Sequence, residues 1–258
     1  MNAPTVGAAS LALALGAALL PAHLAAQQHS SPRDAVVDAR GATRVRVDAR
    51  AGSLRIEGRP GLREVRIRGV ARANDRKYLD AMRLVADRSG SEVRVAVEIP
   101  EVRALPGRVQ RVLDLVIEVP EGMAVDVDDS SGEAEIRRVG ALRVKDSSGE
   151  LVIEDVRGDL DVTDSSGGIS IAQVAGGVRV TDSSGELRIR DVRGAVVVDE
   201  DSSGEIDVRD VRGDVLVRED GSGGIRVDGV GGNLTVRDGG SGGVRVGRVA
   251  GTVRVPRS

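Results

Sequence analysis

Six aspartates recur at an almost constant interval in the second half of the chain, and each opens a short run of small polar residues. They are Asp129, Asp146, Asp164, Asp182, Asp201 and Asp220, with gaps of 17, 18, 18, 19 and 19 residues. If each interval is one turn of a stacked structure, these carboxylates lie about 4.8 Å apart in a column. Like charges at that distance repel each other unless a cation or solvent compensates them. This carboxylate column is therefore the first candidate for metal chemistry.

Two interpretations of the carboxylate column are open. In one, calcium bridges successive carboxylates, as in glycine-rich calcium-binding β-rolls. In the other, which we favour, each aspartate bonds its own backbone in a turn at a solvated corner, where salt screens the repulsion. The nine-residue calcium repeat is absent, and the last copy of the motif, residues 239–242, has no aspartate. We therefore predict neither a metal nor another cofactor.

Residue types exclude most other catalytic chemistry. The chain has no cysteine, and its two histidines, His23 and His29, precede the segment that we expect to fold. Thiolate nucleophiles, Cys/His zinc sites and Ser–His–Asp triads are therefore not expected. A pair of carboxylates on a β-helix needs neither residue type, so a carbohydrate-active enzyme stays an alternative. Every copy of the repeat follows the same rule, however, and we predict no catalytic residue.

The charge balance argues against a nucleic-acid partner. The chain has 37 basic and 40 acidic residues, so it has no excess of positive charge to neutralise phosphates. It has no Phe or Trp and one Tyr, which leaves no aromatic platform on which bases could stack.

The aspartates belong to an internal repeat, and a Ser-Gly pair marks every copy. The glycines of this pair, which we expect to be structural turn residues, are Gly132, Gly149, Gly167, Gly185, Gly204, Gly223 and Gly242. After each one the chain reads x-Φ-x-Φ-x-x-Φ and then, beyond a second glycine corner, Φ-x-Φ, where Φ is aliphatic. Over seven copies, 34 of these 35 positions hold Val, Ile or Leu, and Ala134 is the exception. We expect the second-corner glycines, such as Gly158 and Gly194, to need the same conformational freedom.

The Φ-x-Φ alternation is typical of a β-strand with one buried face. A single copy is too small to enclose a core, so the copies must stack on one another. The sequence predicts an all-β fold, a single-chain parallel β-solenoid (β-helix) of about seven regular 17–19-residue coils over residues 123–258. Along its outer faces the series Arg143–Asp161–Arg179 and Arg188–Asp207–Arg226 alternate in sign, which predicts cross-strand ion pairs.

Residues 41–122 are less regular and are interpreted as the N-terminal cap that a solenoid requires, with a separate small domain as the alternative. We expect a short amphipathic helix over residues 75–87 and a loop around Pro100, Pro106 and Gly107. Further strands are expected at residues 45–47, 54–56, 65–67, 93–99 and 113–119.

The N-terminal segment has the pattern of an export signal. An apolar run from Ala8 to Leu20 is followed by Pro21 and small residues through Ala26. This pattern indicates a cleavable signal peptide over residues 1–26 rather than a membrane span. We expect residues 27–40 to be a flexible linker, the mature chain to carry no integral membrane segment, and the protein to be secreted or periplasmic.

Three features together carry a family resemblance: the strand at residues 115–119, the Pro120-Glu121-Gly122 turn after it, and the serial Ser-Gly coils. With them the chain resembles the DUF4097 family of bacterial extracytoplasmic β-solenoids, often labelled "putative adhesin", over roughly residues 40–256. The resemblance implies a cell-envelope or secreted location and supplies no catalytic residue. In that family another small polar residue often replaces the corner aspartate, which argues against an obligatory metal role.

We therefore expect a non-enzymatic scaffold or adhesin-like binding protein of the bacterial cell envelope, whose partner is an unidentified envelope or surface component. A carbohydrate-active enzyme on a β-helix and a calcium-stabilised adhesive module are the alternatives. After residues 253–255 no capping helix is predicted. Pro256 and the flanking arginines either protect this end or flank a surface for end-to-end self-association.

Overall fold

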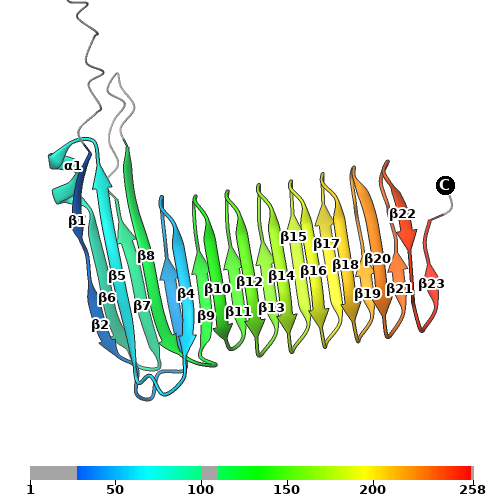
Figure 1. Cartoon of the computed structure of the whole chain (residues 1–258), viewed down its shortest axis with the longest axis horizontal. Helices are drawn as coiled ribbons and strands as arrows, with labels where there is room; N and C mark the ends of the chain where they lie inside the picture. Colours follow the sequence, from blue (N-terminus) through cyan, green and yellow to red (C-terminus); the bar gives the residue numbers. More distant parts are fainter. Residues whose placement is uncertain (1–27, 100–109, 257–258) are drawn as a thin grey trace, which may run out of the picture.

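The computed structural model describes residues 28–99 and 110–256. Within them the chain forms two large β-sheets that enclose one elongated core (Figure 1). The expected signal peptide at residues 1–26 and the expected loop at Pro100, Pro106 and Gly107 lie outside the described residues.

Each repeat copy contributes one strand to each sheet, and we call such a pair of strands one rung of the solenoid. The first sheet receives β10 (Ala134–Val139), β12 (Leu151–Val156), β14 (Ile169–Val174), β16 (Leu187–Val192), β18 (Ile206–Val211), β20 (Gly224–Val230) and β22 (Gly243–Val246). The second receives β11 (Leu142–Lys145), β13 (Leu160–Thr163), β15 (Val178–Asp182), β17 (Val196–Asp201), β19 (Val215–Val217), β21 (Leu234–Val236) and β23 (Val253–Arg254). Neighbouring repeat strands are parallel, and each residue pairs with the residue that holds the same position of the motif in the next copy. The predicted all-β parallel solenoid of about seven turns is confirmed.

The core consists of the repeat's aliphatic columns. In the first six copies, each of the five aliphatic positions is at most 4% exposed, including Ala134 at 1%. The seventh copy differs, because its rung is the last one in both sheets. There Val246, Val253 and Val255 are 38%, 43% and 40% exposed.

A bend inside the repeat strands β10 to β20 of the first sheet explains the x-x pair of the repeat motif. Five residues at the second x position adopt φ of 54–59° although none is a glycine: Arg138, Asp155, Gln173, Asp191 and Asp210. The strand ladder skips this position in each of these copies, as between the Arg137–Glu154 and Val139–Val156 pairs. The skip acts like a β-bulge and turns the next aliphatic side chain back into the core.

Stacked glycines define the Ser-Gly corner. Gly185 has φ of 141°, and a Cβ on it would lie 1.6 Å from the carbonyl oxygen of Gly167 in the preceding rung. The same positive φ (129–144°) and the same contact with the preceding rung are found at Gly132, Gly149, Gly167, Gly204 and Gly223, and Gly242 makes the contact without a positive φ. This corner therefore accepts no side chain, because successive backbones touch there.

The second corner uses its glycines differently, and the expectation of conformational freedom there is wrong. Gly158 and Gly194 do not have positive φ. What they supply is space, since a Cβ on Gly194 would lie 2.4 Å from the carbonyl oxygen of Gly176.

One rung is inserted out of chain order. It consists of β3 (Arg44–Asp48) and β4 (Leu54–Arg59), and it lies between the rung of β7 (Glu92–Glu98) with β8 (Arg111–Pro120) and the rung of β9 (Ala124–Asp128) with β10. Leu54 and Ile56 pair with Ala134 and Ile136, so this early segment obeys the repeat's register. After β4 the chain builds the cap, returns through β7 and β8, and then passes the β3–β4 rung to begin β9 (Figure 1).

The N-terminal end is covered by antiparallel strands and a short helix. The covering elements are β1 (His29–Pro32), β2 (Ala35–Asp38), β5 (Glu64–Ala73), α1 (Arg76–Ala81) and β6 (Arg83–Ser89). Among the described residues, no helix is long and apolar enough to cross a bilayer. The expected cap is present, and its antiparallel pairing ends the parallel stack.

Three expectations about this region are wrong. Most of the supposed linker at residues 27–40 forms β1 and β2, because both segments find antiparallel partners along β5. His29 therefore belongs to the folded part, where it pairs with Ala73 in the ladder. The helix expected at residues 75–87 ends at Ala81, because residues 83–89 pair with β7 in a hairpin.

The ion pairs on the outer faces only partly follow the alternating charges. Arg143 and Asp161 form the expected cross-strand pair, with 3.5 Å between Nε and Oδ2. Arg179 instead reaches Asp199 at 2.5 Å, and Arg188 pairs with Glu186. The strand register thus follows from the sequence, whereas the partner of each arginine does not, because its long side chain can reach several carboxylates.

Substitution at the stacked glycines tests the fold directly. We expect Gly185→Ala to lower the free energy of unfolding by more than about 2 kcal/mol, because the methyl group meets a backbone oxygen at a strained φ. Chemical denaturation followed by far-UV circular dichroism measures the change.

Gly168→Ala is the matched control, because a Cβ there would have no atom within 4 Å and its φ is not positive. We expect its stability to stay within about 0.5 kcal/mol of the parent. Equal stability of the two variants would contradict the stacked-glycine corner.

Candidate functional site

The carboxylate column faces inward. All six aspartates, from Asp129 to Asp220, are at most 5% exposed, so the expected solvated corner is wrong. Each pair of neighbours follows the rung register, as in the Asp182–Asp201 and Asp201–Asp220 pairs. Five of the six aspartates do accept a hydrogen bond from a backbone amide of their own turn, as expected. For example, the Ser130 amide donates to Asp129 Oδ1 at 2.7 Å, and the Ser165 amide donates to Asp164 Oδ1 at 2.8 Å.

The second oxygen of each carboxylate has no hydrogen-bond partner. This holds for Oδ2 of Asp129, Asp146, Asp164, Asp182 and Asp201, and for both carboxylate oxygens of Asp220. Burial raises the pKa of Asp129 to about 7 and that of Asp164 and Asp201 to about 6, and repulsion between neighbouring carboxylates adds to the effect. Burial also raises the pKa of Asp146, Asp182 and Asp220. Asp129, whose pKa is about 7, is therefore partly protonated near neutral pH.

Small residues close both ends of the carboxylate column. Ala49 occupies the position beside Asp129, since its amide donates to the Asp128 carbonyl in the neighbouring rung, and it is 7% exposed. Gly239 follows Asp220 at the other end and is also buried. No group of three or more acidic, His or Cys side chains in the described ranges has a geometry that could hold a metal ion. Calcium binding by the column stays a hypothesis.

A groove runs along the bend in the first sheet. It has a volume of about 950 Å³ and extends over five rungs, from Asp155 to Gly229. The left-handed residues Asp155, Gln173, Asp191 and Asp210 form one wall, and the residues two positions later form the other wall. The groove therefore exists because every rung bends at the same position.

The two walls of the groove carry opposite charges. Asp155, Asp191 and Asp210 stand on one side, and Arg157, Arg193 and Arg212 stand on the other. Arg157 is held by Glu121 at 2.5 Å, whereas Arg193 and Arg212 are exposed and form no ion pair with another described residue. Two guanidinium groups are thus free to donate hydrogen bonds to a ligand in the groove.

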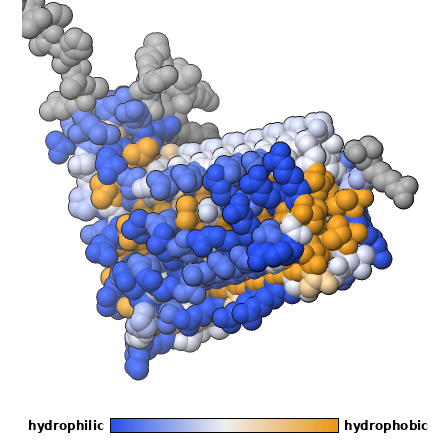
Figure 2. Space-filling view, turned by 45° about the vertical axis from the view of Figure 1, so that its right-hand side comes forward, coloured by the Kyte–Doolittle hydropathy of each residue, from blue (hydrophilic) through white to orange (hydrophobic). Residues whose placement is uncertain are grey.

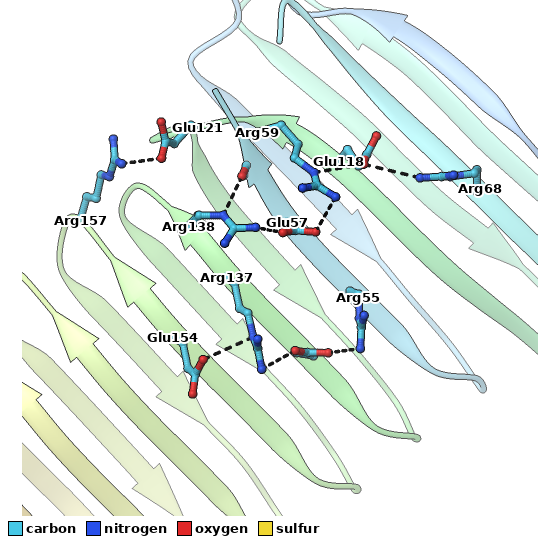
Figure 3. A network of polar contacts seen from close by, with 12 residues as sticks. Arg55, Glu57, Arg59, Arg68, Glu118, Glu121, Arg137, Arg138, Glu154 and Arg157 are labelled. Atoms are coloured by element: carbon cyan, nitrogen blue, oxygen red, sulfur yellow. Dashed lines mark hydrogen bonds and ion pairs between the residues drawn. The ribbon is translucent and has the colours of Figure 1, made fainter. Parts of the chain in front are cut away.

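A polar network lies beside one end of the groove, where the inserted rung meets the repeats (Figure 3). Glu57 on β4 pairs with Arg138 on β10 and with Arg59 at 3.0 Å, and Arg59 continues to Glu118 on β8 at 3.1 Å. Arg138 Nε also donates to the Gly58 carbonyl at 3.2 Å. Because the network joins β8, β4 and β10, it fixes the start of the groove relative to the cap.

The outer face of the second sheet has a smaller depression of about 460 Å³. Arg143, Asp161 and Arg179 lie along it, together with Val197. Val197 and Leu216 are neighbours in register, as expected, but both are half-buried. We regard this face as an ordinary solvated face.

The groove was not predicted from the sequence, although its signal is present there. The x-x pair between the second and third aliphatic positions breaks the period of two, and such a break indicates a bend. Aspartate or glycine, which adopt the left-handed conformation more readily than most residues, holds that position in four copies, but Arg138 and Gln173 hold it in two others, so the residue types alone do not mark the bend.

Comparison with known proteins finds solved structures that align with most of this chain at low sequence identity and low TM-score. No protein-family model and no curated protein matches the chain, so the resemblance to DUF4097 stays a hypothesis. Among solved structures, a "putative adhesin" from Parabacteroides merdae aligns with 13% identity and a TM-score of 0.43, covering 88% of this chain and 96% of that one. A "putative cell adhesion protein" from Clostridium sporogenes has 12% identity and a TM-score of 0.32, covering 88% and 98%. A "putative adhesin" from Parabacteroides distasonis has 11% identity and a TM-score of 0.35, covering 89% and 97%. Similarity at this level carries no argument about what the present chain binds.

The carboxylate column makes stability depend on pH. Its pKa values are raised above the unfolded value of 3.8, so the folded chain binds more protons than the unfolded chain between about pH 4 and pH 7. The contribution of the column to stability is therefore present at low pH and is lost as pH rises through 6 to 7. We expect a higher thermal midpoint near pH 5 than near pH 8.

The triple variant Asp164→Asn, Asp182→Asn and Asp201→Asn is the test of cause. The amide keeps the turn acceptor and carries no charge, so the variant should gain stability at pH 8 and show a weaker pH dependence. If the variant keeps the pH dependence of the parent, groups other than the carboxylate column cause it. A thermal midpoint that falls when a chelator is added would instead support calcium.

Proposed function

We propose that this protein is a non-enzymatic binding or scaffold protein of the bacterial cell envelope, secreted or periplasmic, and that the groove along the bend is its binding site. The observation that carries the proposal is the groove itself: it has a volume of about 950 Å³ and two oppositely charged walls. The signal-peptide pattern expected over residues 1–26 supports the location.

The shape of the groove favours an extended ligand. Five rungs contribute to it, and rungs are about 4.8 Å apart, so it runs for about 19 Å parallel to the solenoid axis. An aspartate on one wall and an arginine on the other recur in three of the five rungs, whereas the other two rungs have Gln173 with Ala175 and Gly229 with Gly231. A ligand with its own short repeat, such as a glycan chain, meets the same pair of charged groups at the adjacent rungs of Asp191 and Asp210.

The chemistry of the groove favours a polar, uncharged or mixed-charge ligand. Carboxylates on one wall accept hydrogen bonds, and guanidinium groups on the other donate them. No aromatic side chain lines the groove, so stacking contributes nothing to recognition. The hydrogen-bond acceptors on one wall and the donors on the other support a glycan of the envelope as the ligand class.

The regularity of the repeat supports a non-enzymatic role. The groove residues Asp191, Arg193, Asp210 and Arg212 occupy equivalent positions in adjacent rungs and have similar exposure. A catalytic site needs groups whose environments differ, so that one acts as acid and another as base. Equivalent environments suit repeated binding contacts.

Binding of solubilised peptidoglycan strands, measured by isothermal titration calorimetry, tests this proposal. We expect Arg193→Ala with Arg212→Ala to weaken binding at least about tenfold, because two charged donors are lost from one wall. Asp191→Asn with Asp210→Asn should weaken it less, because each amide keeps one acceptor.

Arg188→Ala is the matched control, since Arg188 is an exposed arginine on the same sheet and does not line the groove. We expect it to bind like the parent. Parent-like binding by the Arg193 and Arg212 variant would contradict the assignment of the groove, and release of glycan fragments would contradict the non-enzymatic role.

A further inference from the structure

The C-terminal end of the solenoid exposes the inside of its last rung. Val244, Val246, Val249, Val253 and Val255 occupy the positions that are buried in the six preceding copies. Here they are partly exposed, because β22 and β23 are the outermost strands of both sheets among the described residues. Figure 2 shows this end as an apolar area beside a largely polar flank. We call these five valines and the arginines among them the end face.

The end face is also the cationic part of the repeat array. Residues 239–256 contain three arginines and no acidic residue, whereas residues 123–238 contain 14 basic and 26 acidic residues. Arg248 is paired with Asp228 of the preceding rung at 2.7 Å. Arg245 and Arg254 are exposed and form no ion pair with another described residue. An occupant of the end face must therefore match an apolar centre with positive charge around it.

The strand edges at this end are poorly suited to pair with a second copy. β22 has four residues and β23 has two, against six residues in β16 and in β17. Pro256 follows β23, and short edges with arginine and proline are the usual means of preventing edge-to-edge pairing. A tail-to-tail dimer would also bring the arginines of one end face against those of the other.

An anionic lipid surface satisfies these conditions. It accepts apolar side chains at the boundary between headgroups and acyl chains, and it attracts arginines without requiring strand pairing. Apart from the six buried aspartates of the carboxylate column, residues 123–238 contain 20 acidic and 14 basic residues, so the flank of the solenoid is repelled by the same surface. Contact through the flank is therefore disfavoured, and contact through the end is favoured.

We infer that the end face is a peripheral docking surface for anionic phospholipid, and that the solenoid stands end-on on a membrane. The inference goes beyond the proposed glycan groove and does not depend on it. Val246 and Val253 supply the apolar contact, and Arg245 and Arg254 supply the electrostatic one. The groove, which runs parallel to the solenoid axis, then projects away from the bilayer.

Vesicle flotation with the full chain tests the inference. We expect binding to phosphatidylcholine vesicles that contain about one third phosphatidylglycerol, and none to phosphatidylcholine alone. Arg245→Gln with Arg254→Gln should lower the partition coefficient about 25-fold, at about fivefold per arginine. Val246→Ser with Val253→Ser should lower it at least about fivefold, and raising the salt from about 0.1 M to about 0.5 M should release the parent protein.

Two controls carry matched changes elsewhere. Val36→Ser alters a valine that is 64% exposed on the cap, and Arg188→Gln alters an exposed arginine on the flank. Both should bind vesicles like the parent, and so should the Arg193→Ala, Arg212→Ala groove variant, which separates this inference from the glycan proposal. Far-UV circular dichroism verifies that every variant is folded.

Three results would overturn the inference. The first is equal binding to vesicles with and without phosphatidylglycerol. The second is a loss of binding in the controls as large as that in the end-face variants. The third is a lipid-free dimer, seen by light scattering, that Val246→Ser with Val253→Ser dissociates, because that result assigns the end face to a second copy.

Discussion

The contact of one rung's backbone with the next determines the rest of this structure. At the Ser-Gly corner, Gly185 lies so close to the Gly167 carbonyl that a methyl group cannot be inserted. Parallel hydrogen bonds continue this contact along both strands of each rung, and the aliphatic columns align as a result. The strand register is then fixed, since a slip of one residue would turn the aliphatic side chains of that strand toward solvent. Burial of the carboxylates, the shared bend and the groove all follow from identical rungs being held in line.

Most of the repeat region could be predicted from the sequence, because its fold is local and periodic. The aliphatic positions from Ala134 to Val236 are buried as expected, and their strands pair as expected. The place of β3 and β4 could not be predicted, because chain order gives no sign that β9 and β10 will stack beyond them. The inward turn of Asp164 was missed for a different reason: polar side chains at a corner usually face water, and here the stacked corner encloses them.

The candidate sites differ in how they arise. The groove and the carboxylate column are produced by repetition, because equivalent positions of successive rungs line up along the solenoid axis. The end face arises where repetition stops, and Val253 is exposed there only because no further rung covers it among the described residues. Charge divides the molecule in the same way, with acidic flanks along the array and arginines at its last rung. A protein of this form can present different chemistry along its length and at its tip without any change of fold.

The inserted β3–β4 rung has a mechanical consequence. When tension is applied at residue 256, the regular rungs can detach one after another, since each is held mainly by its predecessor. Unravelling meets a different element at β9–β10, because that rung rests on a segment that is clamped from the other side by β7 and β8. The polar network around Glu57 bridges the same boundary. Under tension the regular rungs after β10 should therefore unfold first. The region in which the β3–β4 rung lies between β7–β8 and β9–β10 should unfold last.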